Sequence, residues 1–369
     1  TDKNDLSNAL TDTIKSHFVS DVPVGIMLSG GIDSSAVLAL ARRHTSGELK
    51  TFSLSFPQEY CNEGGLAKKT AEAFATEHTE WCLTGDEAKK LLPLFFAAMD
   101  QPSIDGLNSF AISKVVAENG VKVVLSGLGG DELFGGYPSF RTIPNLKQAH
   151  SLLRIFLGAG PIALDLTGRI LKDSRFLRLS QFFSTPYSTK QAFKAIRSIF
   201  TLREIAEIWP QYALQCTLEE NDNFNHHGLQ EKSLLSSIAE LEIANYMRNQ
   251  LLRDTDVFSM KWGIEARVPF VDTALYNTVR RLPDNLRFQP GKQCLVDAVG
   301  NIPPWLLGLP KRGFMLPYSE WFATTWGDFL KKSPVPNCVL IDTWYRRWAL
   351  VVLQEWCEIN GFSFPSPVQ

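Results

Sequence analysis

Short apolar runs alternate with longer amphipathic stretches over the first 140 residues of the chain. The apolar runs predict buried strands, and the stretches between them repeat apolar positions at helical spacing. The predicted strands cover residues 22–27, 49–56, 78–83 and 121–125, and the predicted helices cover residues 6–19, 36–41, 63–75, 86–99 and 108–119. This alternation is typical of an α/β fold, a parallel sheet with helices on both faces. Such sheets bind ligands at the carboxyl ends of their strands.

The pattern changes after Tyr137. No further convincing strand follows, and proline-rich joints separate stretches of helical periodicity. The predicted helices here cover residues 152–171, 202–208, 234–252 and 344–356. We therefore expect an α/β core over residues 1–140 and a mostly α-helical part over residues 141–369. Together they should form one integrated domain, with the helical part completing the active site.

Composition narrows the class of protein. The chain has 369 residues, of which 44% are hydrophobic and 21% charged, as is normal for a globular protein. Its net charge of -2 gives no electrostatic case for binding nucleic acid. Six cysteines without a CxxC pair favour free thiols in a reducing compartment, so we expect a cytoplasmic protein.

Membrane and export signals are absent from the pattern. No apolar run reaches the length of a membrane span, so we expect no membrane partner. We also expect no signal peptide. The first residue is Thr1 and not Met, which is typical of a processed chain or of a domain from a longer protein.

A glycine turn, here called the first glycine loop, follows the first predicted strand. It covers residues 28–35, with the sequence Leu-Ser-Gly-Gly-Ile-Asp-Ser-Ser. Adjacent glycines let backbone N–H groups approach a ligand, and the helix that follows adds unpaired N–H donors and its positive dipole end. The serine hydroxyls complete an anion cradle suited to phosphate. Asp33 would repel such a ligand unless a divalent cation lies between them. The turn lacks the Gly-Lys-Ser/Thr of a Walker A loop, and the alternative is an ordinary glycine turn capped by serines.

A second glycine loop, residues 126–137, follows the fourth predicted strand and repeats the order of serine, glycines and acid. Its many glycines imply that backbone approaches a ligand closely. Asp131 could share a Mg²⁺ with Asp33, because Mg²⁺ is commonly held by one or two carboxylates plus substrate phosphates. Glu132 could do the same or could cap the next helix. The alternative is a long glycine loop with helix-capping acids.

The two glycine loops and three later segments resemble motifs of known protein families. The first glycine loop resembles the PP-loop of the ATP pyrophosphatase superfamily, and the second resembles a motif of the asparagine synthetase family. Residues 252–256, 262–272 and 310–314 are similar to later signatures of that family. The resemblance implies an adenine nucleotide α-hydrolase-like fold and an ATP-dependent, amide-forming ligase. Such a ligase adenylates a carboxylate, by default aspartate, and releases pyrophosphate; an amine then displaces AMP.

The resemblance also implies roles for individual residues. The positions that match the family's ATP site are Leu28, Ser29, Gly30, Gly31, Asp33, Ser34, Leu54, Ser126 and Gly127. Asp33 and Asp131 match magnesium-linked acids. Lys292 matches a lysine that stabilises the negative charge built up during adenylation. These three residues form the predicted catalytic set, with ATP and Mg²⁺ as cofactors. Taken by itself, Lys292 would be a surface lysine.

The chain departs from the family pattern in three ways. Leu128 stands where asparagine synthetases usually carry Glu and β-lactam synthetases carry Tyr, and leucine can neither accept a hydrogen bond nor move a proton. Another group, such as Glu132 or Asp105, must then serve, and we expect the loop around Asp105 near the carboxylate substrate. Val296 stands where an arginine is common. The family's N-terminal glutaminase domain has no counterpart in these residues, so we expect this ammonia source in cis or in trans.

Several alternatives stay open. The same chemistry could act on a sugar acid, a peptide or a β-lactam-type precursor. A tRNA-modifying PP-loop enzyme is disfavoured by the lack of a basic excess and of a CxxC pair. A non-catalytic nucleotide-binding module is disfavoured by the presence of Asp33, Asp131 and Lys292. The adjacent His226 and His227 lack a third ligand at suitable spacing, which favours a surface loop over a metal site.

Overall fold

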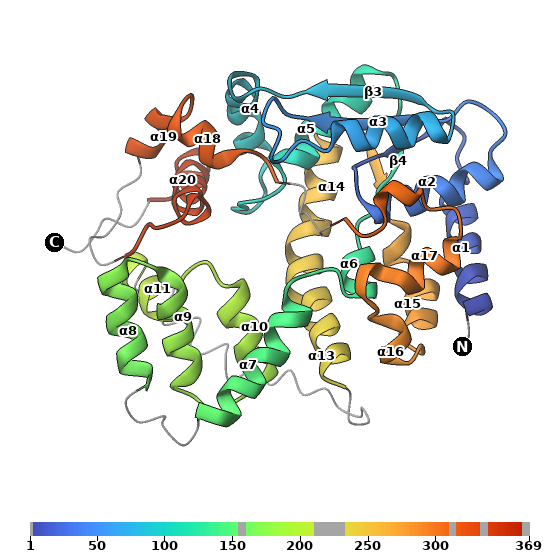
Figure 1. Ribbon diagram of the computed structural model, residues 1–369. Helices are drawn as coiled ribbons and strands as arrows, with labels where there is room; N and C mark the ends of the chain where they lie inside the picture. Colours follow the sequence, from blue (N-terminus) through green and yellow to red (C-terminus); the bar gives the residue numbers. More distant parts are fainter. Residues whose placement is uncertain (1–2, 154–159, 210–232, 310–314, 333–338, 364–369) are drawn as a thin grey trace. The chain divides into compact units, whose positions relative to one another are not determined.

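The computed structural model describes residues 3–153, 160–209, 233–309, 315–332 and 339–363 (Figure 1). The chain divides into two compact units, one formed by Thr1–Tyr137 with Glu242–Trp321 and the other by Pro138–Leu241 with Phe322–Gln369. This division differs from the contiguous one expected at residue 140. The difference arises because a late strand and several late helices pack onto the N-terminal sheet.

A five-stranded parallel sheet forms the centre of the first unit. Its strands are β1 (Val24–Met27), β2 (Lys50–Ser55), β3 (Glu77–Cys82), β4 (Val123–Leu125) and β5 (Glu265–Arg267), in the order β3-β2-β1-β4-β5. The register sets Ile26 of β1 opposite Thr51 of β2 and Leu125 of β4. The chain runs outward from β1 to β3 and then returns to β4, so the strand order reverses between β1 and β4. Ligands of open α/β sheets bind at such a switch point.

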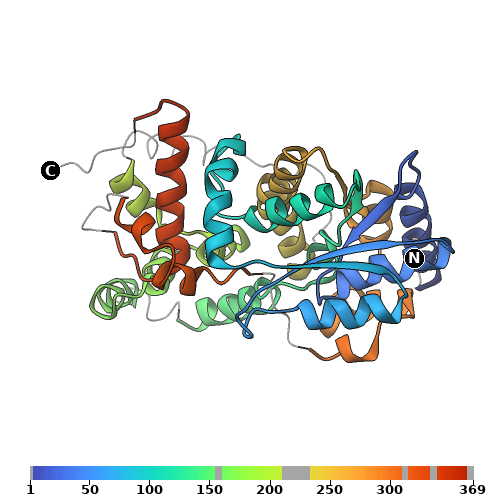
Figure 2. The ribbon, with the colours of Figure 1, turned by 90° about the horizontal axis from the view of Figure 1, so that it is seen from above.

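Helices lie on both faces of this sheet, and the predicted fold class is confirmed. Figure 2 shows α3 on one side of the strands and α4 and α5 on the other. The α-helices that lie entirely in this unit are α1 (Lys3–His17), α2 (Ile32–His44), α3 (Gly64–Ala73), α4 (Gly85–Ala98), α5 (Leu107–Glu118), α6 (Gly130–Phe134), α14 (Leu252–Met260), α15 (Thr273–Val279), α16 (Asp284–Arg287) and α17 (Gln293–Val299). Helix α18 (Tyr318–Ala323) begins in this unit. A π-helix, η2 (Glu242–Leu251), precedes α14.

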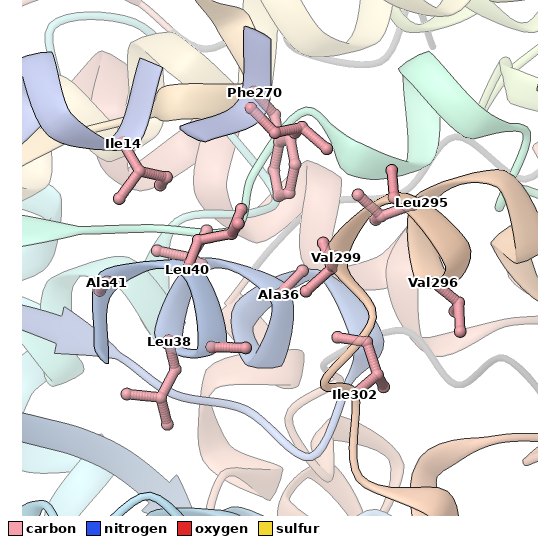
Figure 3. Packing of buried hydrophobic residues seen from close by; sticks show 14 of the residues in the cluster. Ile14, Ala36, Leu38, Leu40, Ala41, Phe270, Leu295, Val296, Val299 and Ile302 are labelled. Atoms are coloured by element: carbon pink, nitrogen blue, oxygen red, sulfur yellow. The ribbon is translucent and has the colours of Figure 1, made fainter. Parts of the chain in front are cut away.

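Helix α2 runs through the middle of the core, and residues 34–41 are all buried. A helix that is buried on every side needs apolar or small residues all round, which the sequence supplies. Figure 3 shows Ala36 and Leu40 of α2 among Leu295 and Val299 of α17. This packing fixes the start of α17 relative to the start of α2. Val296, which stands where an arginine is common in the resembling family, belongs to the same buried cluster.

The prediction that no strand follows Tyr137 is wrong. Strand β5 pairs with β4, and the Glu265 N–H donates to the Lys122 carbonyl at 2.8 Å. The three-residue strand holds one apolar residue between two charged ones, so it shows no apolar run. It forms because the edge of β4 offers backbone partners, which is a tertiary effect.

Helix boundaries also differ from the predicted ones. Where one helix was predicted over residues 152–171, α7 (Ser139–Leu153) ends and α8 (Gly160–Leu171) begins. The predicted helix over residues 234–252 consists of α13 (Leu234–Leu241) followed by the π-helix η2. Apolar periodicity does not distinguish an α-helix from the wider π-helix, so this change could not be seen in the sequence.

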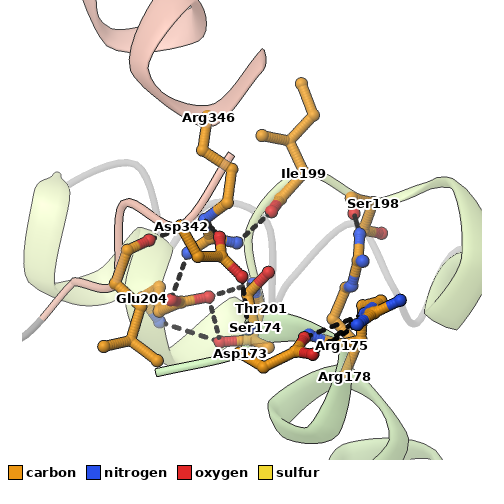
Figure 4. Close-up of polar contacts among 11 residues, drawn as sticks. Asp173, Ser174, Arg175, Arg178, Ser198, Ile199, Thr201, Glu204, Asp342 and Arg346 are labelled. Atoms are coloured by element: carbon orange, nitrogen blue, oxygen red, sulfur yellow. Dashed lines mark hydrogen bonds and ion pairs between the residues drawn. The ribbon is translucent and has the colours of Figure 1, made fainter. Parts of the chain in front are cut away.

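The described residues of the second unit contain only helices and connections. These helices are α7, α8, α9 (Ser174–Phe183), α10 (Thr189–Arg197), α11 (Leu202–Ile208), α13, α19 (Gly327–Lys332) and α20 (Trp344–Ile359). The fully buried Arg346 forms an ion pair with Glu204 and donates to the carbonyls of Leu340 and Ile199 (Figure 4). This pairing offsets the cost of burying two charges. In the part of the chain that is described, no helix is both long enough and apolar enough to cross a membrane.

Candidate active site

The first glycine loop links the end of β1 to the first turn of α2. Leu28 continues the sheet with a backbone hydrogen bond to β2, and its side chain is buried. The Ser29 N–H donates to the Ser34 hydroxyl at 3.1 Å, and the two serine hydroxyls lie 3.0 Å apart. A Cβ at Gly30 would lie 2.9 Å from the Leu66 Cβ, so this position requires glycine. The hydrogen bonds therefore fold the loop tightly around the N-terminus of α2.

The second glycine loop packs directly against the first. A Cβ at Gly127 would lie 2.6 Å from the backbone nitrogen of Ser34, and a Cβ at Gly130 would lie 2.5 Å from the Asp33 carboxylate. Contacts this short leave room only for glycine. Because β1 and β4 are neighbours, the two loops meet at one edge of the sheet. The meeting places Asp33 and Asp131 in a common site.

Lys292 joins these two acids. Its ammonium group contacts the Asp33 carboxylate and lies 2.5 Å from Asp131 Oδ1. Only 7% of the lysine side chain is exposed. The surface position expected for Lys292 when it is taken by itself is therefore wrong. The residue has a φ of 56° and follows Gly291 with a φ of 69°. A non-glycine residue held in this left-handed region is uncommon, and such strain is concentrated at functional sites.

The electrostatics of this triad favour a charged lysine. Burial opposes the ammonium form, but attraction to Asp33 and Asp131 outweighs it and raises the pKa of Lys292. One positive charge thus lies between two negative charges. An additional cation would be needed before the site could take up a polyphosphate without repulsion.

Asp33 and Asp131 are the residues that could hold this cation. The described residues contain no cluster of three or more His, Cys, Asp or Glu side chains suited to a metal. Two carboxylates beside an anion cradle nevertheless match the way Mg²⁺ is bound when substrate phosphates supply further ligands. The donor chemistry therefore fits Mg²⁺ held together with a nucleotide.

Two further positions predicted to bind ATP are Leu54 on β2 and Ser126 at the start of the second glycine loop. Leu54 is buried on β2, next to the strand that leads to Leu28. The Ser126 N–H donates to the Arg267 carbonyl of β5 at 2.9 Å, which fixes the start of the second glycine loop. The Leu128 N–H donates to the Ser126 hydroxyl, and the half-buried leucine side chain offers no polar group.

Two tyrosines connect the two acids proposed for the substrate. Glu132 Oε1 accepts a hydrogen bond from the Tyr137 hydroxyl at 2.8 Å, and the rings of Tyr137 and Tyr246 make an edge contact at 5.7 Å. The Tyr246 hydroxyl donates to Asp105 Oδ2 at 3.2 Å. Burial raises the pKa of Glu132 to about 7, against the opposing effect of the Tyr137 hydrogen bond. The four side chains form a continuous row that begins one residue after Asp131.

A cavity of about 230 Å³ adjoins Glu132. Its other lining residues are mostly apolar and come from the second glycine loop, η2 and the segment around Phe270: Gly129, Leu133, Ile243, Met247, Phe270, Val271, Thr273 and Tyr276. A single carboxyl group in an apolar lining suits a small, weakly polar molecule better than a phosphate.

The structure thus brings Asp33, Asp131 and Lys292 into contact. It places Glu132 and Asp105 at the two ends of a row in which two hydrogen bonds are joined by the ring contact of Tyr137 with Tyr246. Their chemical roles stay predictions. Tyr246 was missed by the sequence analysis, because an isolated tyrosine in a helical stretch gives no signal. The motif at residues 310–314, the pair His226 and His227, and Cys216 and Cys338 lie outside the described residues.

Comparison with known proteins identifies the family. The family model described as asparagine synthase matches residues 5–337. The chain belongs to the asparagine synthase family. This membership confirms the resemblance drawn from the two glycine loops and the later signatures.

Individual relatives agree with this assignment. The chain is 29% identical over 333 residues to the glutamine-hydrolyzing asparagine synthetase 1 of Bacillus subtilis, covering 89% of this chain and 51% of the relative. It is 29% identical over 328 residues to a putative glutamine-hydrolyzing asparagine synthetase of Mycobacterium tuberculosis, covering 86% and 48%. It is 33% identical over 165 residues to asparagine synthetase B of Escherichia coli, covering 41% and 30%. The chain spans about half the length of the first two relatives.

Proposed function

We propose that these residues form the synthetase part of an ATP-dependent amide-forming ligase, with aspartate as carboxylate and asparagine as product. The observation that carries the proposal is the contact of Lys292 with both Asp33 and Asp131 where the two glycine loops meet. The names of the relatives support the choice of substrate. The first reaction is adenylation, in which ATP is divided between its α and β phosphates.

In the first step, a carboxylate oxygen attacks the α-phosphorus and the bond to pyrophosphate breaks. The backbone N–H groups and the serine hydroxyls of the first glycine loop bind the leaving pyrophosphate. The buried side chains of Leu28 and Leu54 pack on the adenosine. Lys292 stabilises the charge that develops at the phosphorus, because a fixed cation in a site shielded from water acts strongly. Asp33 and Asp131 would hold Mg²⁺, which neutralises phosphate charge when bound.

In the second step, an amine nitrogen attacks the acyl carbon and the bond to AMP breaks, while the nitrogen loses a proton. Leu128 cannot take this proton. Glu132 and Asp105 are the carboxyl groups of the site that could do so, and we place the carboxylate substrate near Asp105. The relatives are named as glutamine-hydrolyzing, which supports a glutaminase domain, in cis or in trans, as the source of ammonia. Cys61, Cys82, Cys294 and Cys357 are free thiols, which supports a cytoplasmic location.

Carboxylate-dependent exchange of labelled pyrophosphate into ATP tests the first step. We expect exchange that requires Mg²⁺ and aspartate and that is lost in Lys292→Ala. The matched control is Lys3→Ala, which removes a lysine paired with one acid on the surface. Exchange with a sugar acid or a peptide, but not with aspartate, would reassign the substrate. Absence of exchange with every carboxylate would overturn the proposal.

A further inference from the structure

We infer that Asp254 is a positioning residue: through Ser103 it fixes the loop of residues 101–106 and so sets the place of Asp105 in the carboxylate site. The inference rests on the proposed function for the identity of that site. The loop of residues 101–106 and helix α14 belong to the same compact unit.

Asp254 is a buried acid on α14, with 4% of its surface exposed. Its Oδ2 accepts a hydrogen bond from the Ser103 hydroxyl at 2.6 Å. This length is typical of an O–H group that donates to a carboxylate, which is a stronger bond than one between neutral groups. Ser103 is itself buried, so water does not compete freely for the bond.

Ser103 passes this anchoring on to Asp105. The Ser103 oxygen accepts a hydrogen bond from the Asp105 N–H at 3.3 Å. The Asp105 side chain then reaches the Tyr246 hydroxyl. Asp254 therefore determines the backbone position of a residue that it does not itself hydrogen-bond. This geometry assigns it an indirect role, distinct from contact with substrate.

The end of the loop is seated on the same helix. Gly106 has a φ of 87°, and a Cβ there would collide with the Phe258 ring and lie 3.2 Å from the Asp254 Cβ. At the other end, Arg253 forms an ion pair with Asp100 at 2.6 Å. Gln101 Nε2 also donates to the Asn249 carbonyl at 3.1 Å near the start of the loop. The link through Ser103 holds the loop between these contacts and Gly106.

Burying the carboxyl group of Asp254 is costly, because its charged form loses contact with water. A leucine would fill α14 without this cost. An acid at position 254 is explained if its role is to accept the hydrogen bond from the Ser103 hydroxyl. Asparagine keeps an acceptor oxygen at this place, whereas alanine removes it.

The test measures KM for the carboxylate and for ATP in the pyrophosphate exchange assay. Asp254→Ala and Ser103→Ala should each raise the carboxylate KM by about tenfold, with the ATP KM within about twofold of wild type. Asp254→Asn should give an intermediate value. The double variant should have the same carboxylate KM as the single variants, since each single substitution already removes the hydrogen bond between Ser103 and Asp254. Ser113→Ala, at a buried serine of α5, is the control and should change neither KM.

Equal increases of both KM values, or effects that multiply in the double variant, would overturn the inference. Hydrogen exchange of the amides of residues 103–106 gives a second readout that needs no substrate. These amides should exchange faster in Asp254→Ala and Ser103→Ala than in Ser113→Ala, and unchanged rates would also overturn the inference. If wild type shows no carboxylate-dependent exchange, the proposed function fails, while the hydrogen exchange result still decides the role of Asp254.

Discussion

At the scale of single residues, the candidate site consists of one lysine placed between two acids. Lys292 lies 259 residues from Asp33 in the sequence, yet its ammonium group contacts that carboxylate. Asp33 and Asp131 could be predicted from the sequence because each lies within a glycine loop. Lys292 could be predicted only through the family resemblance, because local pattern carries no information about a contact of this range. The link from Ser103 to Asp254 spans 151 residues and was missed for the same reason.

The first prediction concerns the charge of Lys292. Lys292→Met should lower the rate of carboxylate-dependent pyrophosphate exchange by about 10²–10³-fold, the usual effect of removing one group that stabilises developing charge. Lys3→Met should leave the rate within about twofold, since an exposed ion pair contributes little. A near-normal rate in Lys292→Met, measured with saturating ATP and aspartate, would remove the lysine from the catalytic set.

A second property at this scale is the pKa of the Asp254 carboxyl group. Burial raises its pKa from the ordinary value of 3.8 to about 7. The neighbouring charges of Asp105 and Asp100 add to the rise, while the Ser103 hydrogen bond and Arg253 oppose it. Between these two pKa values the folded state keeps a proton that the unfolded state has lost. The free energy of unfolding therefore falls as pH rises through this window.

The second prediction follows from this sign. The side chain introduced by Asp254→Asn cannot ionise, so this variant should not lose stability in the same way. Its free energy of unfolding relative to wild type should therefore rise by on the order of 2–4 kcal/mol when the pH is raised from about 5 to about 8. Urea unfolding at the two pH values measures the difference. A stability difference between Asp254→Asn and wild type that is the same at both pH values would show that Asp254 does not titrate in this range.

At the scale of elements, the parallel sheet and its helices could be predicted because their periodicities are local. Strand β5 could not, because its three residues form a strand only against the edge of β4. The π-helix η2 was also hidden, since it follows α13 without a break in apolar spacing. The packing of α17 on α2 is the tertiary contact on which the proposed function depends most. It places Lys292, the residue before α17, beside Asp33 in the first turn of α2.

The third prediction uses two glycines with similar backbones. Gly106 and Gly120 both have a positive φ, but only at Gly106 would a Cβ meet other atoms, those of Phe258 and Asp254. Gly120→Ala should cost about 1 kcal/mol of unfolding free energy, the price of the backbone conformation. Gly106→Ala should cost more and should also raise the carboxylate KM. Equal losses of stability in the two variants would mean that the loop does not lie on α14 as described.

At the scale of the whole molecule, the two compact units are interleaved along the chain, so neither is a contiguous segment. A sequence pattern shows where helices begin and end, but it does not show which unit a late helix joins. Each unit is stabilised in its own way. The first has the buried apolar cluster around α2, and the second includes the buried pair of Arg346 and Glu204.

The fourth prediction tests this pair. Arg346→Met leaves Glu204 buried without its main partner and should lower the free energy of unfolding by about 3–5 kcal/mol. The matched control is Arg203→Met, whose side chain is 70% exposed and which lies 3.6 Å from Glu207. That change should cost at most about 1 kcal/mol. Thermal unfolding of the two variants should therefore differ clearly, and similar midpoints would contradict a stabilising role for the buried pair.

The most direct test of the central claim follows one oxygen atom. If the site adenylates a carboxylate, one carboxylate oxygen becomes bonded to the α-phosphorus. The amine then breaks the bond between the acyl carbon and this oxygen, so the oxygen leaves with AMP. Aspartate labelled with ¹⁸O in its side-chain carboxylate, turned over with ATP, Mg²⁺ and ammonium, should yield AMP that carries the label and unlabelled pyrophosphate. Label found in inorganic phosphate with ADP, or amide formed without label in AMP, would contradict the account.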